Sequence, residues 1–397
     1  MLNHIYKLIE EAKKTLDGHI NKTPIFTASN LGENTFIKME HLQRTGSFKF
    51  RGAYNKINNL TEEEKSRGVI ASSAGNHAQG VAKSATEQGI KSTICIPALA
   101  PIAKVEATRN YGADVVLVDG VYDDAYKKAR ELEKEHNYTF LHPFDDEYVI
   151  AGQGTIGLEI MEQLPNVERI IVPIGGGGLI SGIAVAAKTI NPNVEIIGVE
   201  PEGAASMYNS IKKGEIIELD TCGSMADGIA VKRPGDLTFK IISKLVDDIV
   251  LVSEGEIATA ILDLLERNKL VSEGAGAAAI AASKKFNDNK VTCCILSGGN
   301  ININMISRII TKGLYESGRL CEITTVLQDK PGELVTLLTY LKEIGANVLT
   351  INQYAEHEKN DLAQLVVRMV LETKDNEQVE KIYSILASKG YKHYKNI

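Results

Sequence analysis

The chain has 397 residues, of which 44% are hydrophobic and 24% are charged, so it can form a large core and two or three domains. Its formal net charge of −7 argues against the basic surface with which proteins bind nucleic acid or anionic membranes. No run approaches the roughly 18 apolar residues of a membrane-spanning helix. We therefore expect no nucleic acid and no membrane among its partners.

The first 20 residues and the cysteines both favour a cytoplasmic location. Ile5, Ile9 and Leu16 recur at helical spacing among charged residues, which predicts an amphipathic helix and not a signal sequence. The cysteines are odd in number and lack CxxC spacing, which argues against a disulfide framework and a zinc site. They are Cys95, Cys222, Cys293, Cys294 and Cys321. We expect the adjacent pair, in an apolar strand, to be core residues, and we expect no bound metal.

Short β-branched runs alternate with helical patterns from residue 35 to about residue 300. This alternation predicts an α/β fold with parallel sheets covered on both faces. Nine strands are more than one compact sheet usually holds, so we expect two sheet subdomains, the smaller one over about 40–145 inserted in the larger. The strand candidates are 35–40, 68–73, 92–97, 114–119, 139–142, 169–174, 195–200, 248–253 and 290–297.

The pattern changes after about residue 318. The order becomes strand, helix, strand, strand, helix, strand within roughly 75 residues, which predicts a ferredoxin-like unit. A polar loop at 356–361 separates its second and third strands. We place a boundary near 316–321, with one domain over 1–317 and a second over 321–397.

The segment 45–53, TGSFKFRGA, places Lys49 between two phenylalanines at the start of a helix. Most lysines are solvated surface charges. Flanking aromatic residues favour instead a desolvated amine, which is the state that Schiff-base chemistry requires.

The segment 174–182, IGGGGLISG, joins a strand to a helix. Four successive glycines let backbone N–H groups approach a ligand, and the helix dipole favours an anion there. A dinucleotide site is the alternative, since Glu200 ends the next strand. The spacing GxGxxG is not met, because Ile180 and Ser181 stand where the last glycine would fall, so a phosphate group is favoured.

Two further turns follow strands. The segment 73–80, SAGNHAQG, carries an amide and an imidazole that a turn does not need, and 296–300, LSGGN, ends the last strand of the α/β part. Each is weak alone. Together with TGSFKFRGA, the tetraglycine loop, ADGIAV (226–231) and SEGAGA (272–277), they form six motifs in a specific order.

This order resembles the fold type II pyridoxal phosphate enzymes, and within them the threonine dehydratases (threonine ammonia-lyases). The resemblance covers nearly the whole chain, because residues 321–397 resemble the ACT regulatory domain that some of these enzymes carry. It implies two parallel-sheet subdomains of the tryptophan-synthase-β-like fold, a C-terminal ACT domain and pyridoxal 5'-phosphate as the cofactor.

The resemblance also implies a role for each matching residue. Lys49 would form the Schiff base with the cofactor, Asn76 would bind the 3-hydroxyl of its ring, and Ser297 would face the ring nitrogen. Phe48 and Gly228 would pack against the ring faces. The cofactor phosphate would be bound by Gly175, Gly176, Gly177, Gly178 and Leu179, and the substrate carboxylate by the turn of Ser73, Gly75, Asn76 and His77.

The implied reaction is β-elimination from L-threonine to 2-oxobutanoate and ammonia, with L-serine giving pyruvate. Lys49, freed by the substrate, would take the proton from the α-carbon. A neutral Ser297 would give a weaker electron sink than a carboxylate, and we expect it to favour elimination over transamination.

Departures separate the chain from the serine racemases, which share most of these loops. Ala74 stands where a racemase has a serine that acts as the second acid and base, and Val231 replaces a serine that contacts the carboxylate. Ser206 replaces an aspartate of the racemase cation site, which leaves Glu200 as the only carboxylate there. We therefore expect no tight divalent site and interpret Glu200 as a solvated acid at a strand end.

Several interpretations stay open from the sequence. His77 is as readily an inert neighbour of Asn76 as a ligand of the substrate. Glu273 suits the first turn of a helix, where a carboxylate favours the dipole, and we favour that interpretation over a role as a partner in the site. An amino-acid sensor without activity and a β-replacement enzyme such as a cysteine synthase are the alternative functions.

The turn DKPGEL connects the first ACT strand to its helix. Asp329 can cap the turn, Pro331 fixes φ, and Gly332 lets the backbone approach a small ligand. With Glu333 and Leu334, this turn is the candidate effector site; a capped turn in a dimerisation module is the alternative. One ACT copy would pair with a second chain, which predicts a homodimer or homotetramer. The sequence leaves open a biosynthetic role with isoleucine feedback and a catabolic role with nucleotide or amino-acid activation.

Overall fold

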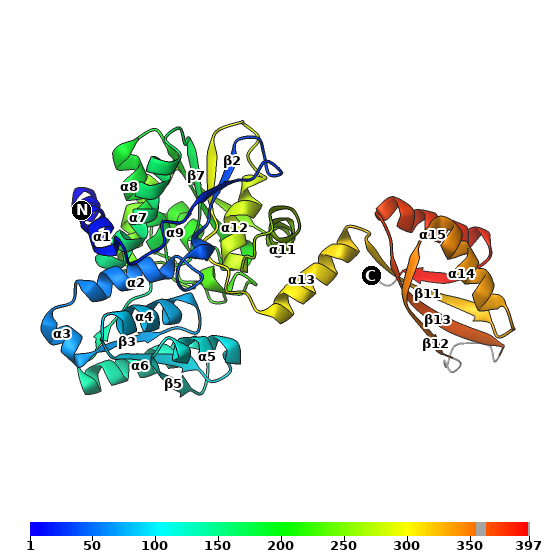
Figure 1. Cartoon of the computed structure of the whole chain (residues 1–397), viewed down its shortest axis with the longest axis horizontal. Helices are drawn as coiled ribbons and strands as arrows, with labels where there is room; N and C mark the ends of the chain where they lie inside the picture. Colours follow the sequence, from blue (N-terminus) through cyan, green and yellow to red (C-terminus); the bar gives the residue numbers. More distant parts are fainter. Residues whose placement is uncertain (355–362, 396–397) are drawn as a thin grey trace. The chain divides into compact units, whose positions relative to one another are not determined.

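The computed structural model describes residues 1–354 and 363–395, and the chain divides into two units, Met1–Asn302 and Ile303–Ile397 (Figure 1). Helix α13 (Ile303–Glu316) belongs to the second unit. The boundary expected near 316–321 therefore falls at the end of this helix. The domain assignments 1–317 and 321–397 stay predictions.

The larger sheet of the first unit has six strands in the order β1-β2-β10-β7-β8-β9. All neighbouring strands pair in parallel except β1, a three-residue antiparallel edge strand that the sequence did not reveal. Figure 1 shows α7 and α8 on one side of this sheet and α12 on the other. The strands are β1 (Ile25–Thr27), β2 (Thr35–Lys38), β7 (Arg169–Pro173), β8 (Glu195–Pro201), β9 (Asp248–Val252) and β10 (Thr292–Ile295).

The smaller sheet has four parallel strands in the order β5-β4-β3-β6 and lies within the predicted range 40–145. Val69 and Ala71 of β3 pack in one apolar cluster with α2 and α4, whereas Ile70 packs with Ala125 of α6. Both faces are apolar, as expected for a parallel sheet between helices. The strands are β3 (Val69–Ser72), β4 (Ser92–Pro97), β5 (Asp114–Val118) and β6 (Thr139–Phe140).

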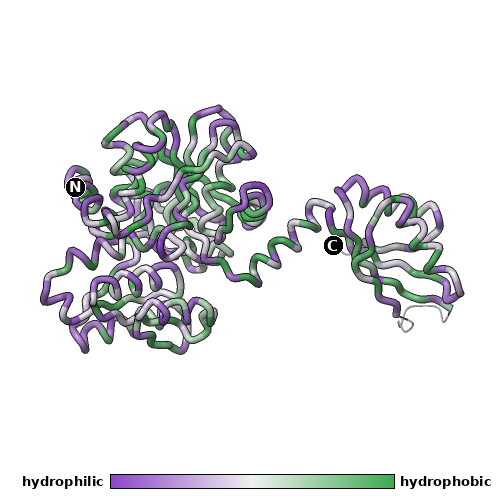
Figure 2. The backbone as a smooth tube through the Cα atoms, viewed as in Figure 1, coloured by the Kyte–Doolittle hydropathy of each residue, from purple (hydrophilic) through white to green (hydrophobic). Residues whose placement is uncertain are grey.

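Twelve α-helices cover these two sheets. Figure 2 shows hydrophobic residues concentrated along the buried strands of the first unit, and Cys293 and Cys294 lie fully buried there, as predicted. In the described part of the chain, no helix is long and apolar enough to cross a membrane. The helices are α1 (Leu2–Leu16), α2 (Lys49–Asn58), α3 (Glu62–Arg67), α4 (Asn76–Glu87), α5 (Ile102–Asn110), α6 (Tyr122–His136), α7 (Glu147–Gln163), α8 (Gly178–Ile190), α9 (Ser206–Lys213), α10 (Asp236–Leu245), α11 (Glu254–Asp263) and α12 (Gly274–Ser283).

Shorter helical turns complete the unit, and they are η1 (Glu40–Leu42), η2 (Glu202–Ala204), η3 (Asp227–Ile229) and the π-turn η4 (Leu264–Asn268). Glycines let several helices cross almost in backbone contact. A Cβ on Gly152 of α7 would lie 2.7 Å from the Cα of Gly52 in α2. A Cβ on Gly182 of α8 would lie 2.5 Å from the backbone nitrogen of Gly154 in α7. Helix α7 therefore ties α2, which begins at Lys49, to α8, which follows the glycine loop.

The second unit has the predicted order of strands and helices after α13. Its antiparallel sheet runs β12-β13-β11-β14, and inward-facing residues of β11 alternate with less buried ones. The apolar face packs against α14 and α15. The polar loop predicted at 356–361 lies outside the described residues. The elements are β11 (Leu320–Gln328), α14 (Glu333–Ile344), β12 (Asn347–Tyr354), β13 (Gln364–Glu372), α15 (Asn376–Ser388) and β14 (His393–Lys395).

Candidate functional site

The predicted site residues follow the carboxyl ends of parallel strands in both sheets. The turn that begins at Ser73 follows β3, the glycine loop follows β7, and Ser297 follows β10. Open α/β sheets bind their ligands at this edge, beside helix amino termini. Lys49 joins the group because Phe48 N–H donates to the carbonyl of Ser297 at 3.1 Å.

Lys49 is the first residue of α2, and its amine is held inside the site. Nζ donates a hydrogen bond of 2.9 Å to the carbonyl of Pro143 and lies 5.2 Å from the centre of the half-buried Phe48 ring. Burial lowers the pKa of this amine to about 8, although the nearby Glu273 carboxylate opposes that shift. A Cβ on Gly80 of α4 would lie 3.2 Å from the Lys49 backbone, so a glycine there allows α4 to pack closely.

The tetraglycine loop forms the amino terminus of α8. Gly177 caps this helix with φ of +96°, a conformation that favours glycine. A Cβ on Gly176 would lie 2.3 Å from the Phe144 ring, and one on Gly178 would lie 2.9 Å from the Phe144 carbonyl. Phe144 follows Pro143, which accepts from Lys49, so one short loop links the amine to the glycine loop. The first N–H groups of α8 have no partner within the helix and can bind an anion.

Asn76, the first residue of α4, is held from both ends of its amide. Nδ2 donates to Glu273 Oε1 at 2.6 Å, and Oδ1 accepts from Asn300 Nδ2 at 2.7 Å. Asn300 also donates to the carbonyl of Thr45 at 2.8 Å. An amide has two donor hydrogens on nitrogen, so the second one on Asn76 is available to a ligand.

Glu273 corrects one of our interpretations. We favoured a simple first-turn acid, but the side chain is buried and bonded to Asn76. Burial, with the Asp227 carboxylate, raises the pKa of Glu273 to about 7, against the effects of Asn76, Lys104 and Lys49. The acid is therefore a partner of the site.

The turn predicted to bind a carboxylate contains two different kinds of group. The N–H of Gly75 donates to Ser73 Oγ at 3.1 Å, so this turn presents a backbone amide beside a hydroxyl. The His77 ring is buried, and Nε2 lies 2.9 Å from the carbonyl of Leu141, which only accepts. Burial and then the Lys49 charge lower the pKa of His77 to about 3, against the pull of the Leu141 bond. The imidazole is thus neutral and bonded to the backbone of Leu141.

Gly228 and Ser297, the remaining residues predicted for the cofactor ring, lie in the structure near Glu273. A Cβ on Gly228, in η3, would lie 3.1 Å from the Cβ of Ala275 and 3.7 Å from Glu273 Oε1. Ser297 is 2% exposed. A Cβ on Gly298 would lie only 2.3 Å from Glu273 Oε1, so this glycine makes room for the acid. Pro143, Phe144 and Asn300 were not singled out from the sequence.

The interpretation of Glu200 as a solvated acid at a strand end is wrong. It is fully buried and not solvated, because its carboxylate accepts from the N–H groups of Met207 and Tyr208 at 3.0 and 2.8 Å, at the start of α9. Burial raises the pKa of Glu200 to about 8, against those two bonds. Ser206, where a racemase has an aspartate, is also buried.

The DKPGEL turn lies in the second unit. Gly332, with φ of +93°, is the N-cap residue of α14, and the cap of the turn by Asp329 stays a prediction. The backbone N–H of Asp329 donates to the carbonyl of Ala363 at 2.8 Å. Glu333 lines a pocket of about 290 Å³, together with Val326, Leu327, Gln328, Gln364, Lys389, Gly390, Tyr391 and Lys392. Pro331 and Leu334 belong to the same turn, and the effector role of all five residues stays a prediction.

The groups around Lys49 fit pyridoxal phosphate. An amine with a lowered pKa can condense with an aldehyde, and a glycine loop at a helix amino terminus can bind a phosphate. The free hydrogen on Asn76 and the hydroxyl of Ser297 are the polar groups available to an aromatic ring. The individual residue roles stay predictions.

Comparisons with known proteins agree with this geometry. Residues 16–298 match the family model described as pyridoxal-phosphate dependent enzyme. An L-threonine ammonia-lyase of Thermotoga maritima is 50% identical over 389 residues, which cover 96% of this chain and 97% of that protein.

Solved structures are similar over most of the chain. The processed form of threonine deaminase isoform 2 from Solanum lycopersicum has a TM-score of 0.75 at 38% identity, covering 78% of this chain and 88% of that one. Maize serine racemase has a TM-score of 0.73 at 36% identity, covering 78% and 98%. These findings confirm the predicted fold class and cofactor. The chain belongs to the family of pyridoxal-phosphate dependent enzymes.

Proposed function

We propose that this enzyme converts L-threonine to 2-oxobutanoate and ammonia, and L-serine to pyruvate and ammonia. The observation that carries the proposal is the half-buried Lys49, whose desolvated amine has a pKa of about 8, beside a glycine loop and a turn that places a backbone amide next to a hydroxyl. The names of the relatives from Thermotoga maritima and Solanum lycopersicum support the choice of threonine.

Pyridoxal phosphate supplies an aldehyde for covalent linkage and a conjugated ring that accepts electrons from a carbon losing its proton. The Lys49 amine carries out two tasks, since its neutral form is both a nucleophile and a base. An ordinary lysine, with a pKa near 10.4, is almost wholly charged at pH 8, whereas roughly half of this amine is neutral there. Burial in the site therefore prepares Lys49 to take the proton from the substrate α-carbon.

The surrounding residues orient the reacting groups. The backbone N–H groups from Gly175 to Leu179 would hold the phosphate, and Asn76, fixed by Glu273 and Asn300, would present its remaining hydrogen to the ring hydroxyl. Ser297 would offer the ring nitrogen a neutral partner. Phe48 and Gly228 would lie against the two faces of the ring.

The turn from Ser73 to His77 binds the substrate carboxylate in this proposal. Ser73 Oγ and the N–H of Gly75 are bonded to one another, and both can donate to an anion that displaces this contact. The His77 imidazole is occupied by Leu141 and neutral, so only its backbone N–H is available for the carboxylate.

Racemisation is the second candidate, because maize serine racemase shares the fold at 36% identity. A racemase needs an acid and base on each face of the α-carbon. Ala74, half-buried in the turn, has no proton to exchange, and Val231 is equally inert. The side chains of this turn therefore favour elimination.

The second unit has a regulatory role in our proposal. An amino acid or nucleotide would bind at the turn of Asp329, Pro331, Gly332, Glu333 and Leu334, and pairing of two such units would give a homodimer or homotetramer. Isoleucine as an inhibitor would indicate a biosynthetic enzyme, and activation by ADP or AMP a catabolic one. A cytoplasmic location belongs to the same proposal.

Product analysis separates the two candidate reactions. The enzyme with pyridoxal phosphate is incubated with L-threonine or L-serine, and oxoacid, ammonia and D-amino acid are quantified. We expect oxoacid and ammonia in equal amounts, with only traces of D-serine. Formation of D-serine in excess over pyruvate would overturn the proposal in favour of racemisation.

A further inference from the structure

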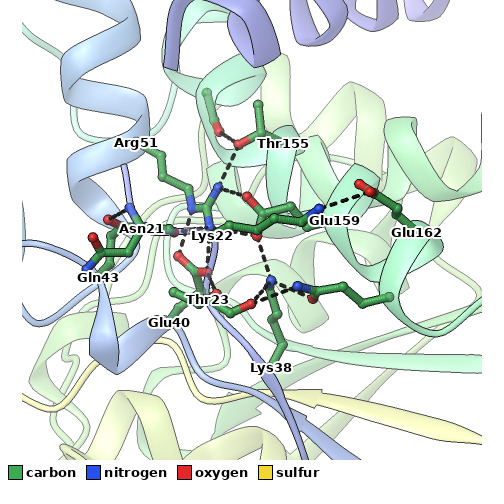
Figure 3. A network of polar contacts seen from close by, with 12 residues as sticks. Asn21, Lys22, Thr23, Lys38, Glu40, Gln43, Arg51, Thr155, Glu159 and Glu162 are labelled. Carbon is green, nitrogen blue, oxygen red and sulfur yellow. Dashed lines mark hydrogen bonds and ion pairs between the residues drawn. The ribbon is translucent and has the colours of Figure 1, made fainter. Parts of the chain in front are cut away.

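A cluster of buried charged side chains surrounds Arg51, which stands two residues after Lys49. Figure 3 shows Lys38, Glu40, Arg51 and Glu159 pointing toward one another from different elements. The first three are fully buried, and Glu159 is 8% exposed. Two cations face two carboxylates, so the cluster is electrically balanced when all four groups are ionised. Buried charges of this kind persist only when they are paired and hydrogen-bonded.

Arg51 is the centre of the cluster. Its Nε and Nη2 donate to Glu40 Oε2 and Oε1, both at 2.8 Å. Its Nη1 and Nη2 donate to Glu159 Oε1 and Oε2 at 2.6 and 3.0 Å. Lys38 Nζ completes the cluster with bonds of 2.6 Å to Glu159 and to the carbonyl of Thr23. Burial opposes ionisation of Glu40, but Arg51 and Lys38 keep its pKa below the usual value.

The cluster joins the elements that place the reacting amine. Arg51 stands two residues after Lys49 on α2, Glu159 is on α7, and Glu40 is in η1. Lys38 ends β2, whose neighbour β10 leads into Ser297. The first turn of α2 is thereby connected to α7, to η1 and, through β2, to the strand that leads into Ser297.

Helix α2 is also held by apolar side chains such as the fully buried Phe50, but its crossing with α7 is made by glycines. It crosses α7 at Gly52 and Gly152, where a Cβ on Gly152 would lie 2.6 Å from the carbonyl of Arg51. Two glycines permit a close approach but supply no side chains that interlock. A planar guanidinium bound by two carboxylates has only one favourable orientation, and a lysine ammonium has many.

We propose that Arg51 is the positioning residue for Lys49. The hydrogen bonds from its guanidinium to Glu40 and Glu159 set the rotation of α2 and thereby the direction of the Lys49 amine. The inference rests on the proposed function, in which Lys49 binds the cofactor. A stabilising role alone would not need these charges, because well-packed apolar residues often replace buried ion pairs without loss of stability.

The experiment compares Arg51→Lys with Arg169→Lys. Arg169 is a matched control, since it is 2% exposed and binds Glu195 at 2.6 Å and Asp288 at 2.5 Å, at the opposite end of β7 from the glycine loop. The double variant Glu40→Gln/Arg51→Met removes one charge of each sign and keeps the Lys38–Glu159 pair. It replaces Arg51→Lys if that variant does not fold.

Two readouts are taken on protein shown to be folded by far-UV circular dichroism. The first is the dissociation constant of pyridoxal phosphate, together with the fraction of Lys49 labelled after borohydride reduction. The second is amide hydrogen exchange in the first turn of α2, measured without the cofactor. We expect Arg51→Lys to weaken cofactor binding at least tenfold and to speed exchange at least tenfold, and Arg169→Lys to change neither more than twofold.

The possible results separate this inference from the proposed function. If the folded Arg51 variants bind and label the cofactor as the unaltered protein does, the positioning role is overturned and the proposed function stands. Equal losses in the Arg51 and Arg169 variants would also overturn it, because they would indicate general destabilisation. If the unaltered protein itself shows no labelling at Lys49, the proposed function fails and the inference fails with it.

Discussion

The chemistry of Lys49 depends on groups that lie far from it in the sequence. Pro143 accepts from its amine, Glu273 provides a nearby negative charge, and the backbone of Lys49 packs against Gly80. None of these groups neutralises the amine by direct ion pairing. Burial is therefore the main reason for its lowered pKa, and desolvation is a common way to make a lysine nucleophilic.

Ser297→Asp tests the neutral partner of the ring. A carboxylate would hold a proton on the ring nitrogen, strengthen the electron sink and favour transamination. We expect the rate of 2-oxobutanoate release to fall at least about tenfold, a barrier increase of about 1.4 kcal/mol. Stopped-flow absorbance and product analysis measure the two outcomes, and Ser297→Ala serves as a control for the lost hydroxyl. An unchanged elimination rate in Ser297→Asp would refute this role.

The buried His77 imidazole should make the stability of the protein depend on pH. Its pKa is about 3 in the folded protein and about 6.5 when unfolded, so the unfolded chain binds a proton first as the pH falls. The contribution of His77 to the free energy of unfolding is therefore largest above pH 6.5, and it declines as the pH falls toward 3. When the pH is lowered from 7 to 5, we expect the free energy of unfolding of the cofactor-free protein to fall. The fall should be about 2 kcal/mol larger in the unaltered protein than in the His77→Gln variant.

Urea unfolding at the two pH values measures this difference. His136→Gln is the control, since His136 is exposed at the end of α6 and should leave the pH dependence of the unaltered protein in place. A His77→Gln variant with the same pH dependence as the unaltered protein would show that the imidazole is not held neutral.

At the scale of elements, glycines set the distances between the helices that carry the site. Gly52, Gly152, Gly154 and Gly182 let α2, α7 and α8 cross closely, and Gly176 accommodates the Phe144 ring against the glycine loop. Each added methyl group would meet backbone or ring atoms that have little room to move. The active-site geometry therefore depends on small residues outside the reacting groups.

Gly176→Ala tests this dependence. The new Cβ would lie 2.3 Å from the Phe144 ring, so the loop must shift, and we expect a loss of stability of about 1–3 kcal/mol. Cofactor affinity should fall as the amides move. The control is Gly255→Ala in α11, where the nearest atom is Ser253 Oγ at 4.0 Å. Thermal unfolding and cofactor titration of both variants provide the comparison, and equal behaviour would contradict the prediction.

The same elements explain what the sequence could predict. Runs such as Arg169–Pro173 are buried on both faces, so their continuous apolar pattern identified the strands of the parallel sheets. The edge strand Ile25–Thr27 was missed because three residues show no period. The bond between Asn76 and Glu273 spans 197 residues, and local pattern cannot reveal such a pair. For the same reason, the buried partners of Arg51 and the burial of Glu200 emerged only from the structure.

At the scale of the whole molecule, the chain combines an α/β unit with the site and a smaller unit with an antiparallel sheet. The second unit contributes none of the groups described around Lys49. Its pocket beside Glu333 and the left-handed Gly332 are features on which a small effector could act. Regulation would then be a coupling between two separate sites.

Gly332→Val tests that coupling. A valine at φ of +93° is strained, although no atom lies within 4 Å of the new Cβ, so the change acts on the turn and not on its neighbours. We expect isoleucine, ADP or AMP to shift the half-saturating threonine concentration of the unaltered enzyme roughly 5–150-fold. The variant should lose most of this shift and keep its rate without effector. If none of the three compounds changes the unaltered enzyme, the effector proposal is wrong.

The central claim is that the Lys49 amine performs elimination on threonine, and the release of 2-oxobutanoate tests it most directly. The unaltered chain and Lys49→Ala are each supplied with pyridoxal phosphate and L-threonine, and oxoacid and ammonia are followed over time. We predict equal amounts of both products from the unaltered chain and a rate at least about a thousandfold lower from Lys49→Ala. The account would be contradicted if the unaltered chain released no oxoacid, or if Lys49→Ala released it at a similar rate.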